Sequence, residues 1–137
     1  METRTYNPET DYEPLLGLLR DEQTFGGVVD EARDSAEKLA ANPESILLAE
    51  RGGQLVGTVT LFENGRAAWL YRFAAQVEGE RKIRAALFAE AKARLAAQGH
   101  TQVIVYAPTG DPHFDNEYTT LGFQKGNDYT AYWQNID

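Results

Sequence analysis

The chain has 137 residues, of which 42% are hydrophobic and 25% are charged, and its net charge at pH 7 is −8. This length suits one compact domain, and the composition is that of a globular protein rather than a disordered one. The absence of cysteine excludes disulfides and thiolate metal sites, and two isolated histidines argue against a histidine-built zinc site. The acidic balance argues against nucleic acids and anionic membranes as partners.

The N-terminal segment METRTYNPETDY lacks the basic start and apolar core of a secretory signal, and no apolar run reaches the roughly 18–20 residues of a membrane span. We therefore expect one domain over residues 1–137, located in the cytoplasm. Charge is distributed unevenly, because residues 1–50 contain twelve acidic and four basic residues, whereas residues 64–105 contain seven basic and three acidic ones. Two interpretations stay open: acidic helix surfaces without a ligand, or an acidic face for a cation beside a basic region for an anion.

Strand and helix signals alternate along the first half of the chain. Pro8 suits the first turn of a helix, and the leucines between Leu15 and Leu19 give that helix an apolar face. Glycine-containing turns at 51–54 and 63–65 separate three apolar strands. In chain order, we expect a strand at 3–7, a helix opening at Asn7-Pro8, a helix at 30–41, and strands at 45–50, 55–62 and 67–75.

The second half is dominated by a long helix, expected at 80–97, whose apolar residues recur on one face from Ile83 to Leu95 and which Gly99 terminates. A strand at 101–106, a short helix that stops at Gly122, and two strands within 123–136 should follow. The element order is β-α-α-β-β-β-α-β-α-β-β, a mixed α/β sheet. Because a long helix joins them, strands 67–75 and 101–106 should be parallel neighbours, and ligands favour the carboxyl ends of such strands.

Three basic residues, Arg81, Lys82 and Arg84, fall in the first turns of the long helix. The helix dipole disfavours cations there by ~0.3–1 kcal/mol each, and a bound polyanion would reverse that penalty. The alternative is that Glu78 and Glu80 pair with these cations on a hydrated surface.

Several segments together resemble the GNAT superfamily of N-acetyltransferases over essentially the full chain. They are LLAERGGQLVGTVTLF, AAWLYRFAAQ, the long helix and the ending EYTTLGF. The most specific is YTTLGF, residues 118–123, which is similar to the family's Y-E-K-L-G-F; GGQLVGTV also matches the usual x-G-x-x-V-G hairpin. The resemblance implies splayed parallel central strands and direct transfer of an acetyl group from acetyl-CoA to a primary amine of a small molecule or peptide.

One segment departs from the family. Its pyrophosphate loop is normally (R/Q)-x-x-G-x-(G/A), whereas this chain has Gly79 in place of the signature residue and Lys82 and Arg84 in place of the two small residues. Long cations cannot give the close backbone approach of glycine, so their side chains would have to reach the phosphates. The cofactor-binding residues that the resemblance implies are Phe73, Ala74, Gln76, Gly79, Glu80, Arg81, Lys82, Ile83, Arg84 and Asp111.

By the same resemblance, Tyr118 is the general acid that protonates the departing thiolate, and the loop containing Asp21 and Glu22 lines the acceptor cleft. Tyr71 would face the acceptor from the sheet. For each of these four residues a purely structural role, as a surface acid or a core aromatic, stays open. No residue is assigned as the general base. The acidic first third suits a cationic acceptor.

Two other interpretations compete with an active enzyme. The chain could be a catalytically degenerate GNAT-like binding module, since the glycine loop is lost. It could also be a homo-oligomer, in the simplest case a homodimer, that pairs through the expected tail strands with Tyr129, Tyr132 and Trp133.

Overall fold

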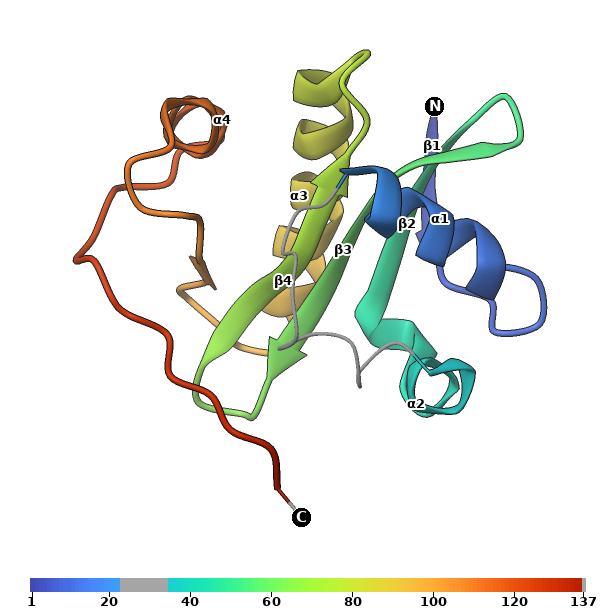
Figure 1. Cartoon of the computed structure of the whole chain (residues 1–137), viewed down its shortest axis with the longest axis horizontal. Coiled ribbons are helices and arrows are strands. Elements are labelled where there is room, and N and C mark those ends of the chain that lie inside the picture. The colour runs from blue at the N-terminus through green and yellow to red at the C-terminus, as the bar shows by residue number, and fades with distance from the viewer. Residues whose placement is uncertain (23–34, 137) are drawn as a thin grey trace. The chain divides into compact units, whose positions relative to one another are not determined.

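The structure, a computed structural model, describes residues 1–22 and 35–136. The chain divides into two compact units, Met1–Tyr106 and Ala107–Asp137, each of which is described by itself. A single domain over the whole chain therefore stays a prediction. Figure 1 shows the course of the chain and its labelled elements.

The first unit contains a five-stranded sheet in the order β1-β2-β3-β4-β5. Neighbours from β1 to β4 are antiparallel, and β4 and β5 are parallel. The mixed α/β class and the parallel pair joined by the long helix are thus confirmed. The strands are β1 (Glu2–Thr5), β2 (Ile46–Arg51), β3 (Gln54–Glu63), β4 (Ala68–Ala75) and β5 (Ile104–Val105).

Helices α1 (Tyr12–Glu22) and α3 (Glu80–Ala97) lie on opposite faces of this sheet (Figure 1), and α2 (Ala36–Ala40) is short. Because both faces are covered, β2 is buried continuously from Ile46 to Ala49 rather than at alternate positions. Ile46 and Leu48 belong to a core cluster with Leu15 of α1. No helix in the described ranges combines the length and apolar composition that a bilayer span needs.

Helix α3 packs closely on β3 at Gly57. A Cβ placed on Gly57 would overlap Ile83 Cγ2 and lie 3.1 Å from both Leu87 Cδ1 and the Ala74 carbonyl oxygen. Ile83 and Leu87 are fully buried, as their spacing on one face of the predicted helix indicates. The close contact between α3 and β3 fixes the helix that leads away from the end of β4.

The predicted helix at Asn7-Pro8 begins later, at Tyr12. Asp11 explains the difference, because its carboxylate accepts the Asn7 N–H at 2.8 Å and its carbonyl accepts the Leu15 N–H at 2.9 Å. Asp11 thus closes the turn that precedes the helix and starts the helical hydrogen bonds. Of the helix expected at 30–41, the structure describes 36–40 as helical, and residues 30–34 lie outside the described residues.

The strand expected at 101–106 is reduced to Ile104–Val105. It pairs only with the start of β4, through Trp69 with Ile104 and Leu70 with Val105. In this parallel register residues 101 and 102 fall beside the turn that precedes β4, which begins only at Ala68, so they have no strand partner there. At the other end of β5, the bulge in β4 described below follows the last paired residue, Leu70.

The second unit contains α4 (Pro112–Thr120), which confirms the expected short helix. Asp111 caps its start, and Gly122, with φ +98°, ends it in the left-handed conformation that favours glycine.

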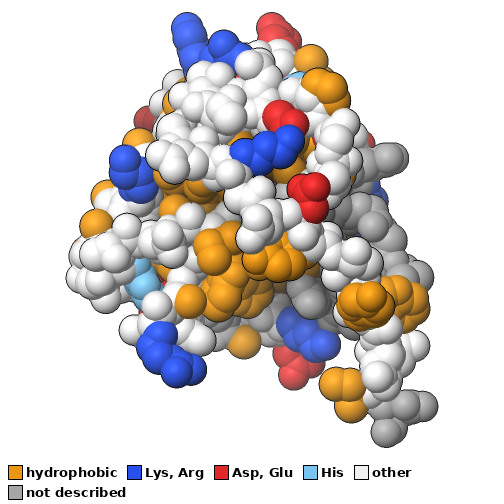
Figure 2. Space-filling view, turned by 90° about the vertical axis from the view of Figure 1, so that its left-hand side faces the viewer, with side chains coloured by type: hydrophobic (Ala, Val, Ile, Leu, Met, Phe, Trp, Pro, Cys, Tyr) orange, Lys and Arg blue, Asp and Glu red, His pale blue; other side chains and the backbone are white. Residues whose placement is uncertain are grey.

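The two strands expected within 123–136 are absent from the described residues there, so that prediction is wrong. The alternation of polar and aromatic residues provides strand propensity, but a strand also needs hydrogen-bonding partners and a surface against which to bury one face. Four hydrophobic side chains of this segment are more than half exposed instead: Tyr129, Tyr132, Trp133 and Ile136. Figure 2 shows exposed hydrophobic side chains on one face of the protein as orange groups.

The contact at Gly57 generates a stability prediction. Gly57→Ala should destabilise the protein by about 1–3 kcal/mol, because α3 must move to accept the methyl group. Gly17→Ala is the control: it lies in α1 with nothing within 4 Å of the added Cβ, and it should be neutral or stabilising by up to about 1 kcal/mol. Urea denaturation of both variants measures the difference, and equal stability of the two would contradict the close contact.

Candidate active site

A β-bulge interrupts the pairing of β3 with β4. Two steps along β3, from Thr58 to Thr60, match three steps along β4, from Ala74 to Tyr71. The additional residue lies at Arg72, whose φ of +49° is the one positive value at a non-glycine residue in the described part of the chain. A bulge bends its strand and increases the local twist. It therefore turns the second half of β4 away from β5.

Beyond the bulge, β4 presents an open edge. Its parallel pairing ends at Leu70, although the strand continues to Ala75. The Gln76 N–H donates to the Val56 carbonyl at 2.9 Å, so Gln76 faces β3. Because backbone groups alternate in direction along a strand, the N–H and C=O groups of Ala75 and Phe73 face the opposite side. This is the splayed geometry that the resemblance implied.

Arg84 reaches this edge from α3, which packs on one face of the sheet. Its side chain is 4% exposed, its Nη1 donates to the Phe73 carbonyl at 3.1 Å, and its Nε pairs with Glu80 Oε2 at 2.8 Å. The guanidinium also lies 4.9 Å from the centre of the Phe73 ring. Arg84, predicted as a phosphate ligand, is thus directed into the first unit. Glu80 is its partner, as the charge-pairing alternative stated, but this pair is buried and does not lie on a hydrated surface.

The turn between β4 and α3 is held by its own polar groups and by a glycine. Gln76 Nε2 donates to the Glu78 carbonyl at 3.2 Å, and the Gly79 carbonyl accepts the Ile83 N–H at 3.0 Å. Gly79 has φ +79°, and a Cβ placed on it would lie 3.1 Å from Nη1 of Arg51. Any other residue would be strained here and would crowd this guanidinium.

Arg51 is a residue that the sequence analysis missed. It lies at the end of β2, and the antiparallel register that pairs Gly57 with Ala75 carries the β2–β3 turn alongside the residues that follow β4. That register could have indicated it. Arg81 and Lys82 are exposed in the first turn of α3, whereas the Ile83 side chain is fully buried against β3 and offers only its backbone.

A cavity of about 700 Å³ opens beside the same end of the sheet. Asp21 and Glu22 at the end of α1 line it, together with Glu50, Gln54 and Gln76. Both predicted acceptor residues and the predicted cofactor residue Gln76 therefore share one cavity. Tyr71 is not among its described lining residues; its ring packs edge-on against Phe62 at 5.4 Å.

An ion cluster forms one wall of the cavity. Arg4 binds both carboxylate oxygens of Asp11, at 2.6 and 3.0 Å, and lies 3.4 Å from Glu50 Oε1. The hydrogen bond from Arg4 holds the pKa of Asp11 below its ordinary value, against the opposing effect of burial. With Asp21 and Glu22, four carboxylates accompany one guanidinium, so the lining carries excess negative charge.

Glu22 is the residue of this lining whose pKa is raised. Burial raises the pKa of its carboxyl group, and the carboxylates of Asp21 and Glu80 raise it further, with Arg84 opposing them. The end of α1 and the start of α3 are thus close enough to interact. A carboxyl group whose pKa is shifted by burial and like charge is typical of functional sites.

The remaining predicted residues lie in the second unit. Tyr118 is 6% exposed, and its ring is stacked on Phe114 at 5.9 Å and edge-on to Phe123 at 5.8 Å. The Asp111 carboxylate accepts the N–H groups of His113 and Phe114, at 3.0 and 3.4 Å, and so acts as a helix cap.

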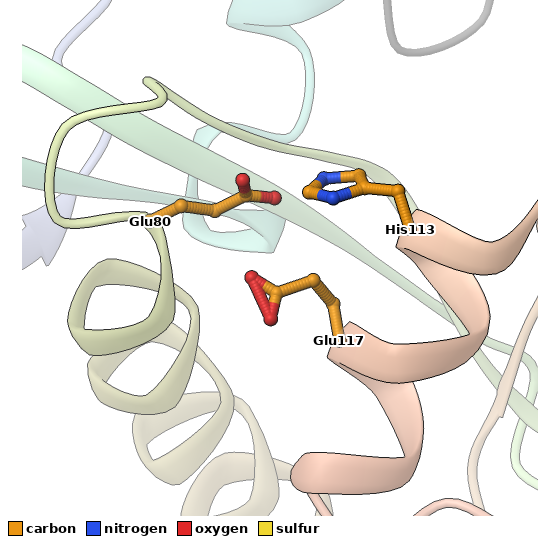
Figure 3. Close-up of side chains that lie close together, drawn as sticks. All are labelled: Glu80, His113 and Glu117. Carbon is orange, nitrogen blue, oxygen red and sulfur yellow. The ribbon is translucent and has the colours of Figure 1, made fainter.

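Figure 3 shows the side chains of Glu80 from α3 of the first unit and of His113 and Glu117 from α4 of the second unit. Glu80 extends from the first turn of α3, while His113 and Glu117 project from α4. His113 is exposed, and Glu117 is buried. His113 and Glu117 are four positions apart, which places them on one side of their helix.

Comparison with known proteins identifies the fold. No family model and no curated protein sequence matches the chain. Among solved structures, PaiA N-acetyltransferase from Thermoplasma acidophilum, in complex with coenzyme A, matches with 24% identity over 93% of this chain and 92% of that one, at a TM-score of 0.76. Aminoglycoside 6'-N-acetyltransferase AAC(6')-IG from Acinetobacter haemolyticus matches with 17% identity over 100% of both chains, also at 0.76.

A third match is ribosomal-protein-alanine N-acetyltransferase from Brucella melitensis, with 14% identity over 98% of both chains and a TM-score of 0.68. The chain therefore has the fold of these acetyltransferases, which confirms the fold expected from the sequence. Fold alone leaves the activity to be argued from the site.

The raised pKa of Glu22 predicts a pH-dependent effect on stability. A carboxyl group whose pKa is higher in the folded state than in the unfolded state binds a proton more readily when the protein is folded. As the pH rises above 4.5, the ordinary pKa of glutamate, such a group therefore lowers the stability of the fold. Glu22→Gln should therefore raise the melting temperature at pH 7, by about 1–3 °C. The gain should disappear below pH 4.

Differential scanning calorimetry across this pH range measures the effect. Glu13→Gln, an exposed position on the same helix that does not line the cavity, is the matched control and should give no increase. A Glu22→Gln protein that is less stable than the parent at pH 7 would show that the ionised carboxylate is stabilising.

Proposed function

We propose that this protein is an acetyl-CoA-dependent N-acetyltransferase that acts by direct transfer on a primary amine of a small molecule or peptide. The observation that carries the proposal is the open edge of β4 beyond the Arg72 bulge, which leads directly into the N-terminus of α3. PaiA, whose solved structure contains coenzyme A, shares this fold. The acidic cavity beside Gln76 supplies room for a second substrate.

Acyl transfer to an amine breaks a carbon–sulfur bond and forms a carbon–nitrogen bond. Acetyl-CoA would supply the activated acetyl group and the thiolate that leaves. The protein has to align both substrates, stabilise the carbonyl oxygen as it becomes anionic, take a proton from the amine and return one to the thiolate. We assign alignment of the acyl carrier to the backbone of Phe73 and Ala75, which faces the open edge. Ala74 and Gln76 border this edge, but their backbone groups face β3, so Gln76 would contribute its side chain from the cavity lining.

The start of α3 suits a diphosphate in three respects. Backbone N–H groups of a helix N-terminus attract anions, and Gly79 places no side chain of its own in front of them. Arg81 and Lys82 are exposed in the same turn, and Arg51 lies next to Gly79. We propose that these guanidinium and ammonium groups supply the phosphate contacts that small residues supply in the family motif. Glu80 contributes through its pairing with Arg84.

Tyr118 is our proposed general acid. The motif YTTLGF supports this role, and packing between Phe114 and Phe123 fixes the orientation of its ring. A phenol with an ordinary pKa near ~10 can protonate a thiolate only when it is held close to the sulfur. Asp111, at the place where family members often have asparagine, fixes the start of the same helix.

The acceptor that fits the cavity best is a cationic amine, such as a polyamine, a lysine side chain or an aminocyclitol. Its lining holds four carboxylates and one guanidinium, and a structural neighbour is named for acetylating an aminoglycoside antibiotic. Asp21 and Glu22 are the proposed anchors, since Arg4 already engages Asp11 and Glu50. Tyr71 stays a proposed acceptor contact on the sheet. A chain without cysteine suits the reducing cytoplasm, where we place this activity.

Coenzyme A binding provides the direct test of the cofactor assignment. Coenzyme A should raise the melting temperature of the parent protein, because a ligand that binds only the folded state stabilises it. Lys82→Ala should weaken this binding about three- to tenfold through loss of a charged phosphate contact. Lys92→Ala, on the same helix but 10 residues further from the turn, is the matched control and should bind like the parent. Thermal-shift titrations with acetyl-CoA, coenzyme A and ATP provide the measurement.

An absent shift in the parent would favour the binding-module alternative over an enzyme. Self-association through the exposed aromatic tail is a separate alternative, and size-exclusion chromatography with light scattering distinguishes a dimer from a monomer whatever the cofactor result.

The acceptor class is tested by comparing amines at equal ionic strength. Cationic amines should be acetylated faster than neutral ones, and the advantage should shrink as added salt screens the carboxylates. Combining Asp21→Asn with Glu22→Gln should raise KM for a cationic amine about threefold or more, with Glu13→Gln as the unchanged control. Equal turnover of cationic and neutral amines would reject this acceptor class.

A further inference from the structure

Arg84 is a buried cation whose position the family motif does not explain. Its side chain is 4% exposed, and a buried charge is costly unless it is paired and its hydrogen-bond donors are used. A motif that ordinarily has a small residue here would carry no such cost. The contacts of the guanidinium therefore indicate what the larger side chain does.

Those contacts join two elements that meet at the candidate site. The Nε of Arg84 is paired with Glu80, one turn earlier on α3, at 2.8 Å. Its Nη1 donates to the backbone carbonyl of Phe73 at 3.1 Å, and the Phe73 ring lies beneath the guanidinium. Arg84 thus connects the first turn of α3 to the strand residue that directly follows Arg72.

The Phe73 carbonyl accepts this bond at the side of β4 that faces away from β3. It lies three residues beyond Leu70, where the pairing of β4 with β5 ends. Buried carbonyl groups need a hydrogen-bond partner, and a bulge with a positive φ needs surrounding contacts to keep its conformation. Arg84 provides both the donor and an anchor on a helix that is itself fixed against Gly57.

We propose that Arg84 is a positioning residue for acyl transfer: by holding the Phe73 carbonyl, it fixes the open edge of β4 on which the acyl carrier aligns. This inference rests on the proposed acetyltransferase function. It assigns Arg84 a role different from that of a phosphate ligand, because the side chain is directed to the strand and leaves Arg51, Arg81 and Lys82 to meet the phosphates.

The test compares Arg84→Met and Arg84→Lys with Arg94→Met. Arg94 is the matched control because it lies on the same helix and also pairs with a glutamate one turn earlier, Glu90, at 3.1 Å. Steady-state kinetics with acetyl-CoA and a primary amine separate kcat from KM. Hydrogen exchange of the amides at 72–76 in the ligand-free protein reports directly on the edge of β4.

Arg84→Met should lower kcat by about tenfold or more, because a small displacement of the reacting groups slows the transfer step strongly. KM for acetyl-CoA should change by less than about threefold. Exchange at 72–76 should accelerate in this variant and stay unchanged in Arg94→Met. Arg84→Lys, which keeps a cation able to reach either partner, should restore part of both properties. It also keeps the test valid if Arg84→Met does not fold.

Two results would overturn the proposal. A raised KM for acetyl-CoA with unchanged kcat and unchanged exchange would identify Arg84 as a phosphate ligand. Equal behaviour of the Arg84 and Arg94 variants in kcat and exchange would leave only a structural role. A parent protein without acetyl transfer would reject the proposed function instead, and the exchange measurement would then decide by itself whether Arg84 holds the strand edge.

Discussion

The bulge at Arg72 is the constraint on which the candidate site depends. A regular β4 would continue to pair with β5, and its last residues would have their backbone groups occupied by a neighbouring strand. The pairing with β5 ends at Leu70, two residues before the positive φ at Arg72, although β4 continues to Ala75. Because a non-glycine residue in this conformation is strained, the surrounding structure has to stabilise it. The position of α3 on Gly57 and the bond from Arg84 to Phe73 do so from the same side of the sheet.

Charges around this end of the sheet oppose stability locally, while the apolar middle of the sheet supports it. Leu47, Leu48, Val59 and Phe73 are fully buried between the two helices. In contrast, Glu22 stays close to two other carboxylates, and Arg84 is withdrawn from water. Local conflicts of this kind, set on a consistent core, are what functional sites usually require. Both the cavity and the start of α3 hold charged side chains at a local cost in stability, although the cavity is acidic and the start of α3 is basic.

Elements whose formation depends on a local residue pattern, such as the long helix, could be predicted from the sequence. The long helix follows from the apolar period between Ile83 and Leu95, and its observed bounds agree with the prediction. The tail at 123–136 has strand-like alternation as well, but strand formation depends on a partner edge that the pattern does not contain. The shortening of β5 likewise depends on a different strand, because β4 begins only at Ala68 and its pairing with β5 ends at Leu70. Arg51 escaped notice because only the register of three strands brings it to Gly79.

The cations at 81–84 illustrate how similar residues in one turn acquire different roles. Position on the helix decides: Arg81 and Lys82 lie on the outer face, whereas Arg84 follows the buried Ile83 and is directed to the sheet. A glycine or alanine at position 84 would leave the Phe73 carbonyl to another donor. The long side chain replaces that donor and, through Glu80, neutralises its own charge within the first unit. The loss of both small residues of the motif is therefore compatible with the proposed site. Arg84, which replaces one of them, supports β4, and Lys82, which replaces the other, stays exposed near the N-terminus of α3.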